Sequence, residues 1–220
     1  NAGEPNDDYS IDPEGTVTVI PFAVPLSGGG WRQTFASFPT VDFQAFNAGA
    51  ARADEITADS SIRAFGPNAT VAQDLQPRSI AFSPDNRTAY VSLQQNNALA
   101  ILDLSSGDVV VDAVRGLGYK DHSVTGQGLD PSDRDDAIAI ATHPVFGMYQ
   151  PDELAMAEIG GTTYVFAANS GDARETDTFE EEERIKSLTL DATAFPNAAT
   201  LQADEGLGRL NVTTTRGDID

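Results

Sequence analysis

Residues 79–114 read SIAFSPDNRTAYVSLQQNNALAILDLSSGDVVVDAV. Apolar and small residues alternate in four runs of this stretch, at residues 79–83, 89–93, 98–104 and 109–114, and a period of two is typical of β-strands. Short segments rich in Pro, Asn, Asp, Ser and Gly separate the runs, and these residues favour turns. The stretch therefore predicts four antiparallel strands joined by tight turns, in a length close to that of one β-propeller blade.

The same pattern recurs elsewhere in the chain. Tyr90–Asn96 aligns with Tyr164–Ser170 at an offset of 74 residues, and Asn169–Asp172 resembles Asn1–Glu4 at an offset of 168 residues. We therefore expect the chain to open at the end of a second strand and to form a third strand at Gly15–Phe22.

The length limits how many such repeats the chain holds. Blades of about 40–45 residues allow at most about five in 220 residues. We predict an all-β fold in which residues 1–220 form a single β-propeller domain that is part of a longer chain, with about three to five four-stranded antiparallel blades of a ring of about seven. Long loop insertions, many of them acidic, are expected at Ala23–Gln76, with a short helix near Ala48–Ile56, and at Arg115–Asp136. A β-sandwich is the structural alternative, because alternating strands alone do not separate the two folds.

The composition excludes several classes of function. Asp and Glu number 34 and Lys and Arg 13, which gives a formal net charge of −21 at pH 7. Such a surface repels nucleic acid phosphates and anionic membranes, and no apolar run approaches the roughly 20 residues that span a bilayer. We expect no nucleic acid partner and no membrane insertion. The lack of cysteine excludes disulfides and thiolate metal sites.

Five strings in the chain resemble one bacterial family. They are Asn1–Tyr9, Ile80–Asp85, Lys120–Ser123, Phe146–Asp152 and Ala168–Arg174. Together they resemble the choice-of-anchor I family, whose members are secreted or surface-attached bacterial β-propeller proteins, many of them labelled alkaline phosphatase-like. The resemblance covers nearly the whole chain and implies a secreted or cell-surface location, with the rest of the propeller or a second chain completing the ring. The chain departs from the family pattern at Ala2 and Ser170, where that pattern has an acidic residue, and at His143, where it has Trp.

The acidic residues lie mainly in three loops. Asn1–Glu14 and Asn169–Arg184 follow second strands and Arg115–Asp136 follows a fourth strand, so an up-and-down blade places all three loops at one end of the ring. Concentrated like charge favours a bound cation with oxygen ligands, and calcium is the first choice, with another divalent metal possible. The alternative is that these Asp side chains bond to the backbone of their own turns. The candidate metal ligands are Glu4, Asp7, Asp8, Asp121, Asp130, Asp133, Asp135, Asp172 and Asp177.

Few residues offer catalytic chemistry. His122, within Lys120-Asp121-His122-Ser123, is a candidate general base or metal ligand. Arg174 and Lys120 are candidate contacts for a phosphate group. We predict a structural role for His143, and a solvated helical start for the run Glu180–Glu183.

Two main functions remain open at this point, and a third, hydrolysis of a lactone or sugar ester in a calcium-bearing central channel, would need a buried Asp or His at the channel mouth. The first is a non-catalytic surface module, stabilised by calcium, that binds a small molecule or glycan at the acidic loop end. The alternative is a metal-dependent phosphoesterase in which loop carboxylates and His122 hold metal ions that activate water. The fold does not decide between them, because propellers carry many unrelated functions.

Overall fold

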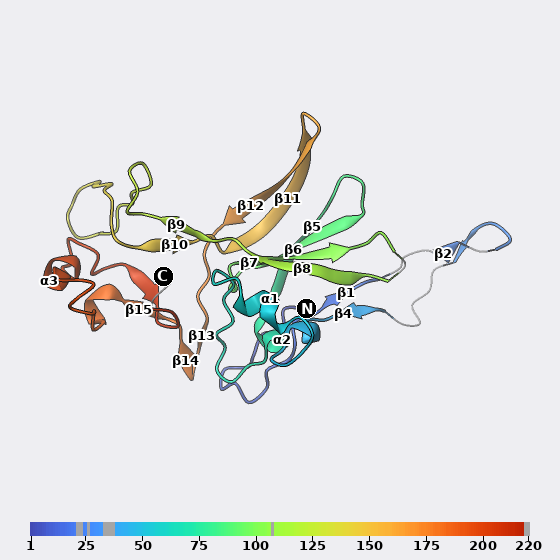
Figure 1. Ribbon diagram of the computed structural model, residues 1–220, viewed down its shortest axis with the longest axis horizontal. Helices are drawn as coiled ribbons and strands as arrows, with labels where there is room; N and C mark the ends of the chain where they lie inside the picture. Colours follow the sequence, from blue (N-terminus) through green and yellow to red (C-terminus); the bar gives the residue numbers. More distant parts are fainter. Residues whose placement is uncertain (21–23, 26, 33–37, 107, 218–220) are drawn as a thin grey trace. The chain divides into compact units, whose positions relative to one another are not determined.

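The computed structural model describes residues 1–20, 24–25, 27–32, 38–106 and 108–217 (Figure 1). The chain divides into two compact units. Unit 1 comprises Asn1–Gly118 and Tyr149–Asp172, and unit 2 comprises Tyr119–Met148 and Ala173–Asp220.

Unit 1 is built on a four-stranded antiparallel sheet. Its strands are β5 (Pro77–Phe82), β6 (Thr88–Leu93), β7 (Ala98–Asp103) and β8 (Val110–Gly116), and they lie in chain order. Figure 1 shows the four strands side by side. The prediction of four antiparallel strands in residues 79–114 is therefore confirmed, with boundaries that differ by a few residues.

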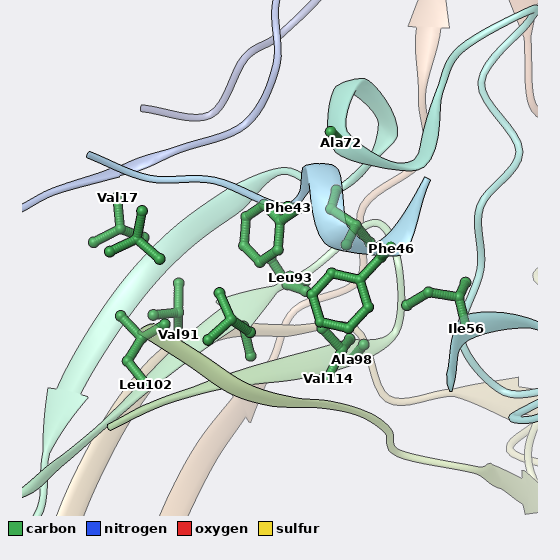
Figure 2. Close-up of a cluster of buried hydrophobic side chains, with 14 of the residues drawn as sticks. Val17, Phe43, Phe46, Ile56, Ala72, Val91, Leu93, Ala98, Leu102 and Val114 are labelled. Atoms are coloured by element: carbon green, nitrogen blue, oxygen red, sulfur yellow. The ribbon is translucent and has the colours of Figure 1, made fainter. Parts of the chain in front are cut away.

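One face of this sheet forms the hydrophobic core. Alternate residues of β6, among them Val91 and Leu93, are fully buried, as the period of two requires. They cluster with Phe43, Phe46 and Leu75 from the preceding segment (Figure 2). This segment contains η1 (Gln44–Phe46), α1 (Ala53–Thr57) and α2 (Val71–Asp74). The short helix expected near Ala48–Ile56 is found as α1, slightly later in the chain.

The opposite face of the sheet receives a long hairpin. Strands β11 (Pro151–Ile159) and β12 (Thr162–Asn169) are joined at Gly160 and Gly161, which both have positive φ, as a two-residue hairpin turn requires. Strand β11 contacts β5 and β6. Ser92, which points away from the core face, donates its hydroxyl to the Asp152 carbonyl at 2.8 Å.

Asn1 lies beside the predicted third strand, which agrees with the repeat alignment. The backbones of Asn1 and Thr16 exchange two hydrogen bonds of 3.0 Å, as residues paired across antiparallel strands do. Strand β1 (Val17–Thr18) follows and pairs with β4 (Thr40–Val41), while β2 (Val24–Pro25) pairs with β3 (Trp31–Arg32). The last residues of the third strand predicted at Gly15–Phe22 lie outside the described residues.

Backbone conformation supports the same alignment. The two offsets bring Gly3, Asn97 and Gly171 to one position of the repeat, and their φ angles are +73°, +51° and +71°. A left-handed residue thus ends the turn after each second strand, where glycine and asparagine are the favoured residues.

Unit 2 consists of short two-stranded pairings. Strand β9 (Tyr119–Asp121) pairs with β10 (Phe146–Met148), and β13 (Glu175–Thr176) pairs with β14 (Phe179–Glu180). Strand β15 (Glu182–Arg184) pairs with β16 (Asn211–Thr213), and the unit also contains η2 (Ile185–Ser187) and α3 (Ala198–Leu201).

The helical start predicted at Glu180–Glu183 is wrong. These residues lie in β14 and β15 and in the step between them, and Glu181 is only 2% exposed. Its N–H donates to the Arg174 carbonyl, and the Thr214 N–H donates to the Glu181 carbonyl. Pairing with distant segments here outweighs the helical preference of glutamate.

The all-β class and the antiparallel sheets are confirmed. The described part of the chain contains seven sheets, of which one has four strands and none is closed. A ring of four-stranded blades therefore remains a prediction.

Candidate functional site

The predicted metal ligands are distributed over both units. Unit 1 contains four of them and unit 2 contains five. The acidic face that the order of the loops predicts would combine residues of both units, so it stays a prediction. Those in unit 1 are Glu4, Asp7, Asp8 and Asp172, and those in unit 2 are Asp121, Asp130, Asp133, Asp135 and Asp177.

Several of these carboxylates accept hydrogen bonds from their own turns. Asp8 accepts from the Ser10 N–H at 3.0 Å, Asp121 from the Ser123 N–H at 2.8 Å, and Asp135 from the Ala137 N–H at 3.3 Å. The bonds from Ser10 and Ser123 lower the pKa values of Asp8 and Asp121. These Asp side chains stabilise the turns in which they lie, which is the alternative reading of the acidic loops.

Asp133 is held by an arginine. The Arg209 Nε donates to Oδ1 at 2.8 Å and a terminal nitrogen donates to Oδ2 at 3.2 Å. This forked contact lowers the pKa of Asp133 to about 2. The carboxylate is thus already neutralised by a cation of the chain itself.

Asp130 is different because one of its oxygens lacks a partner. Oδ2 accepts from the Ala139 N–H at 3.1 Å, while Oδ1 is buried and has no hydrogen-bond partner among the described residues. Across these residues, no group of three or more His, Asp or Glu side chains is close enough to hold a metal ion. The described carboxylates therefore do not fit a ready-made calcium centre, and calcium stays a prediction.

Glutamine side chains hold the turn that carries Asp172. Gln94 donates to the Ser170 hydroxyl at 2.9 Å, and Gln95 donates to the Asp172 carboxylate at 3.1 Å. Gln150 donates to the Asp172 carbonyl at 2.5 Å and accepts from the Asp172 N–H at 3.3 Å. We call Ser170–Asp172 the glutamine-held turn.

Two buried asparagines stabilise the neighbouring turn. Asn96 accepts from the Gln76 N–H at 3.1 Å and donates to the Asp74 carbonyl at 2.9 Å. Asn97 donates to the carbonyls of Ser61 and Gly118 and accepts from the N–H groups of Tyr149 and Gln150. All the hydrogen-bonding capacity of the Asn97 amide is used, which suits its complete burial.

The predicted catalytic residues lie in unit 2. His122 Nδ1 is 2.6 Å from the Gln127 carbonyl oxygen. Since a carbonyl oxygen only accepts, Nδ1 is the donor in this hydrogen bond. A Cβ on Gly147 would lie 2.8 Å from Nε2, so the glycine leaves the space that the imidazole fills. Lys120 lies opposite Gly147 in the β9–β10 pair.

Arg174 and His143 are held by backbone contacts. Arg174 is 4% exposed, and its N–H donates to the Glu181 carboxylate at 3.0 Å. Little of its surface is open to the phosphate contact that the sequence suggested. The His143 N–H donates to the His122 carbonyl at 3.0 Å, in keeping with a structural role.

Comparison with protein families identifies the chain. The model of the Choice-of-anchor I domain matches residues 1–220, the whole length. The chain belongs to the choice-of-anchor I family. No curated protein and no solved structure matches it.

Family membership indicates that this choice-of-anchor I domain is a surface-associated bacterial module. No helix in the described ranges is long and apolar enough to cross a membrane. The sequence patterns of the domain do not single out Gln94, Gln95 and Gln150 as site residues. For Gln94 and Gln95 the only signal in the sequence is their place in the repeat, directly after a predicted second strand.

Proposed function

We propose that this choice-of-anchor I domain is an extracellular binding module, built as part of a β-propeller that further blades or a second chain complete. Its binding role is assigned to one end of the blades, where the second strands finish. This binding end comprises Asn1–Glu4, Gln95 and the glutamine-held turn, supported from inside by the buried side chains of Gln94, Asn96 and Asn97. Loops after second strands emerge at the same end of each blade, which supports the assignment.

The glutamine-held turn is the observation that carries this proposal. Gln94 and Gln95 come from one repeat and Ser170–Asp172 from the next, so the two turns lie directly against each other. Polar side chains of successive repeats thus meet at one end of unit 1, supported by the buried Asn96 and Asn97. Preorganised polar groups on a rigid sheet are typical of binding surfaces.

Calcium is the proposed ligand of this end. Glu4 and Asp172 occupy aligned positions, each directly after the left-handed glycine of its turn. The net charge of −21 makes cation binding favourable. Because the described carboxylates do not converge, a calcium site here needs water molecules or further residues to complete its oxygen ligands.

The phosphoesterase alternative has weaker support. It needs metal ligands around His122, whereas no group of three or more possible metal ligands occurs among the described residues, and the His122 ring is bonded to the Gln127 carbonyl and lies against Gly147. The binding module is therefore the function that the geometry supports better.

Thermal unfolding with calcium or a chelator, together with metal analysis by mass spectrometry, tests the proposal. Calcium at about 100 times its dissociation constant stabilises the native state by about 2.7 kcal/mol, which raises the Tm of a domain of this size by about 5–10 °C. Asp172→Asn is expected to lose most of this increase. Asp191→Asn, which removes a turn carboxylate outside the candidate set, is the matched control and keeps it. An identical Tm in calcium and in chelator contradicts the calcium proposal.

A further inference from the structure

Two buried glutamine side chains beside the binding end each keep one polar atom without a partner. Gln76 is 6% exposed, and its Nε2 has no hydrogen-bond partner among the described residues. Gln94 is 3% exposed, and its Nε2 donates to the Ser170 hydroxyl, whereas its buried Oε1 likewise has no partner in the described part of the chain. Buried polar groups nearly always bond to protein or to ordered water, because leaving them unbonded costs stability. One donor and one acceptor therefore remain to be satisfied.

The two glutamines lie opposite each other at one end of the four-stranded sheet. Strand β5 begins at Pro77 and β6 ends at Leu93, and these two residues are paired, so Gln76 and Gln94 are the next residues along the two strands. The Gln76 N–H donates to the Asn96 side chain at 3.1 Å, which keeps the chain before β5 beside the turn after β6. Residues opposite each other across an antiparallel pair have their Cβ atoms about 5 Å apart, so both amides can reach one small molecule.

The aligned glutamine of the next repeat shows what such an amide needs. Gln76 and Gln150 each precede the proline that begins a first strand, at the offset of 74 residues that also aligns the second strands. Both polar atoms of the Gln150 amide are bonded to the backbone of Asp172. The residue that aligns with Asp172 in the first repeat is Ala98, which lies in β7 and is paired with β6 on one side and β8 on the other. Gln76 therefore needs a partner other than the one that its counterpart uses.

The chemistry of the two atoms selects the occupant. A molecule that satisfies both must accept a hydrogen bond from Gln76 Nε2 and donate one to Gln94 Oε1. A metal ion satisfies the oxygen alone and a carboxylate satisfies the N–H group alone, whereas a water molecule satisfies both. The burial of both atoms also favours the smallest molecule that can do so, and buried water commonly bonds to polar groups without protein partners. We propose that one internal water molecule joins Gln76 Nε2 to Gln94 Oε1.

This water site goes beyond ligand binding, because it assigns an internal support of the binding end that needs no calcium. Gln94 donates to Ser170, so the water connects the start of β5 to the glutamine-held turn. Among the described residues, Gln76 itself makes no hydrogen bond to that turn. Any effect of Gln76 on the turn therefore passes through the water and Gln94. Gln76 is in this sense a positioning residue for the glutamine-held turn.

Solution NMR on the isotope-labelled, unmodified chain tests the water directly, in buffer without calcium. A nuclear Overhauser effect is expected between the side-chain amide protons of Gln76 and a long-lived water molecule. It disappears in Gln94→Met, which removes the second partner of the water but keeps an apolar side chain of similar length. Gln150 is the matched control, because its buried amide already has both polar atoms bonded to protein, and it is expected to show no such effect.

Hydrogen exchange at the Asp172 amide, which is bonded to Gln150, tests the connection to the turn. Gln76→Met is expected to speed this exchange about two- to tenfold, the effect of one lost hydrogen bond. Gln44→Met removes an exposed side-chain hydrogen bond elsewhere and leaves the exchange unchanged. The water signal is measured in the unmodified chain, so it decides the question even if Gln76→Met folds poorly. A missing water signal at Gln76, its persistence in Gln94→Met, or unchanged exchange in a folded Gln76→Met overturns the proposal.

Discussion

Asn97 offers a direct test of how the repeat turn is stabilised. Its amide joins four backbone groups, the carbonyls of Ser61 and Gly118 and the N–H groups of Tyr149 and Gln150. The residue is fully buried, and its φ of +51° lies in the left-handed region. Substitution therefore affects both hydrogen bonding and backbone conformation.

The magnitude follows from these contacts. The bonds to Ser61 and Gln150 are buried, and each orphaned group costs about 1–3 kcal/mol. The other two bonds are partly buried, and each contributes about 0.5–1 kcal/mol. Asn97→Gly is thus expected to lower the free energy of unfolding by about 3–8 kcal/mol. Asn97→Ala loses about 1 kcal/mol more, because alanine is strained at positive φ.

Urea denaturation of the two variants measures these losses. Asn86 provides the matched control, since its φ is +56° and its side chain is exposed. Asn86→Ala is expected to cost about 1 kcal/mol and Asn86→Gly close to nothing. An Asn97→Gly variant within about 1 kcal/mol of the unmodified protein would refute the reasoning, because the four bonds would then contribute almost nothing.

Three further predictions concern unit 2. Glu181→Ala is expected to lower the free energy of unfolding by more than about 2 kcal/mol, because it removes the buried acceptor of the Arg174 backbone N–H. The control Glu183→Ala changes an exposed side chain and is expected to stay within about 0.5 kcal/mol of the unmodified protein. Equal losses for the two variants in urea denaturation would contradict this. Arg209 lowers the pKa of Asp133 from 3.8 to about 2, so this carboxylate stabilises the fold above about pH 4 and loses its contribution as the pH falls toward 2. Acid unfolding curves of Asp133→Asn should accordingly be less steep between these pH values, and an unchanged slope would show that the ion pair contributes nothing. Gly147→Ala displaces the His122 ring, which is visible as a shift of its imidazole NMR signals, and unchanged signals would mean that the glycine is not required.

The central sheet was predictable because its signals are local. Alternating residues and turn-forming residues coincide throughout residues 79–114, so strand positions follow from side-chain periodicity alone. The repeat was also predictable from the sequence. Gly3 and Gly171 occupy the same left-handed position of the repeat, and asparagine, found there as Asn97, is the other residue type that tolerates this conformation.

The short pairings of unit 2 were not predictable in the same way. Glu180–Glu183 suggests a helix by composition, yet Glu181 is buried by backbone pairing with Arg174 and Thr214. Such contacts join residues far apart in sequence and leave no periodic signal.

Only part of the candidate site could be predicted from the sequence. Composition identifies the acidic residues but not what each carboxylate contacts, and Asp133 is bound by Arg209, 76 residues away. The glutamine-held turn was missed because amide side chains carry no catalytic or metal-binding signature. It depends on the packing of β11 against β5 and β6.

Thiol crosslinking tests most directly the claim that turns of successive repeats meet at one end of unit 1. The chain has no cysteine, so the double variant Gln95→Cys/Asp172→Cys contains the only two thiols. The account predicts that a short bismaleimide reagent links them within one molecule, whereas Gln95→Cys/Asp108→Cys stays unlinked, because Asp108 lies in the turn at the other end of the sheet. A chain in which Gln95→Cys/Asp172→Cys fails to crosslink, or crosslinks no faster than the control, would contradict it.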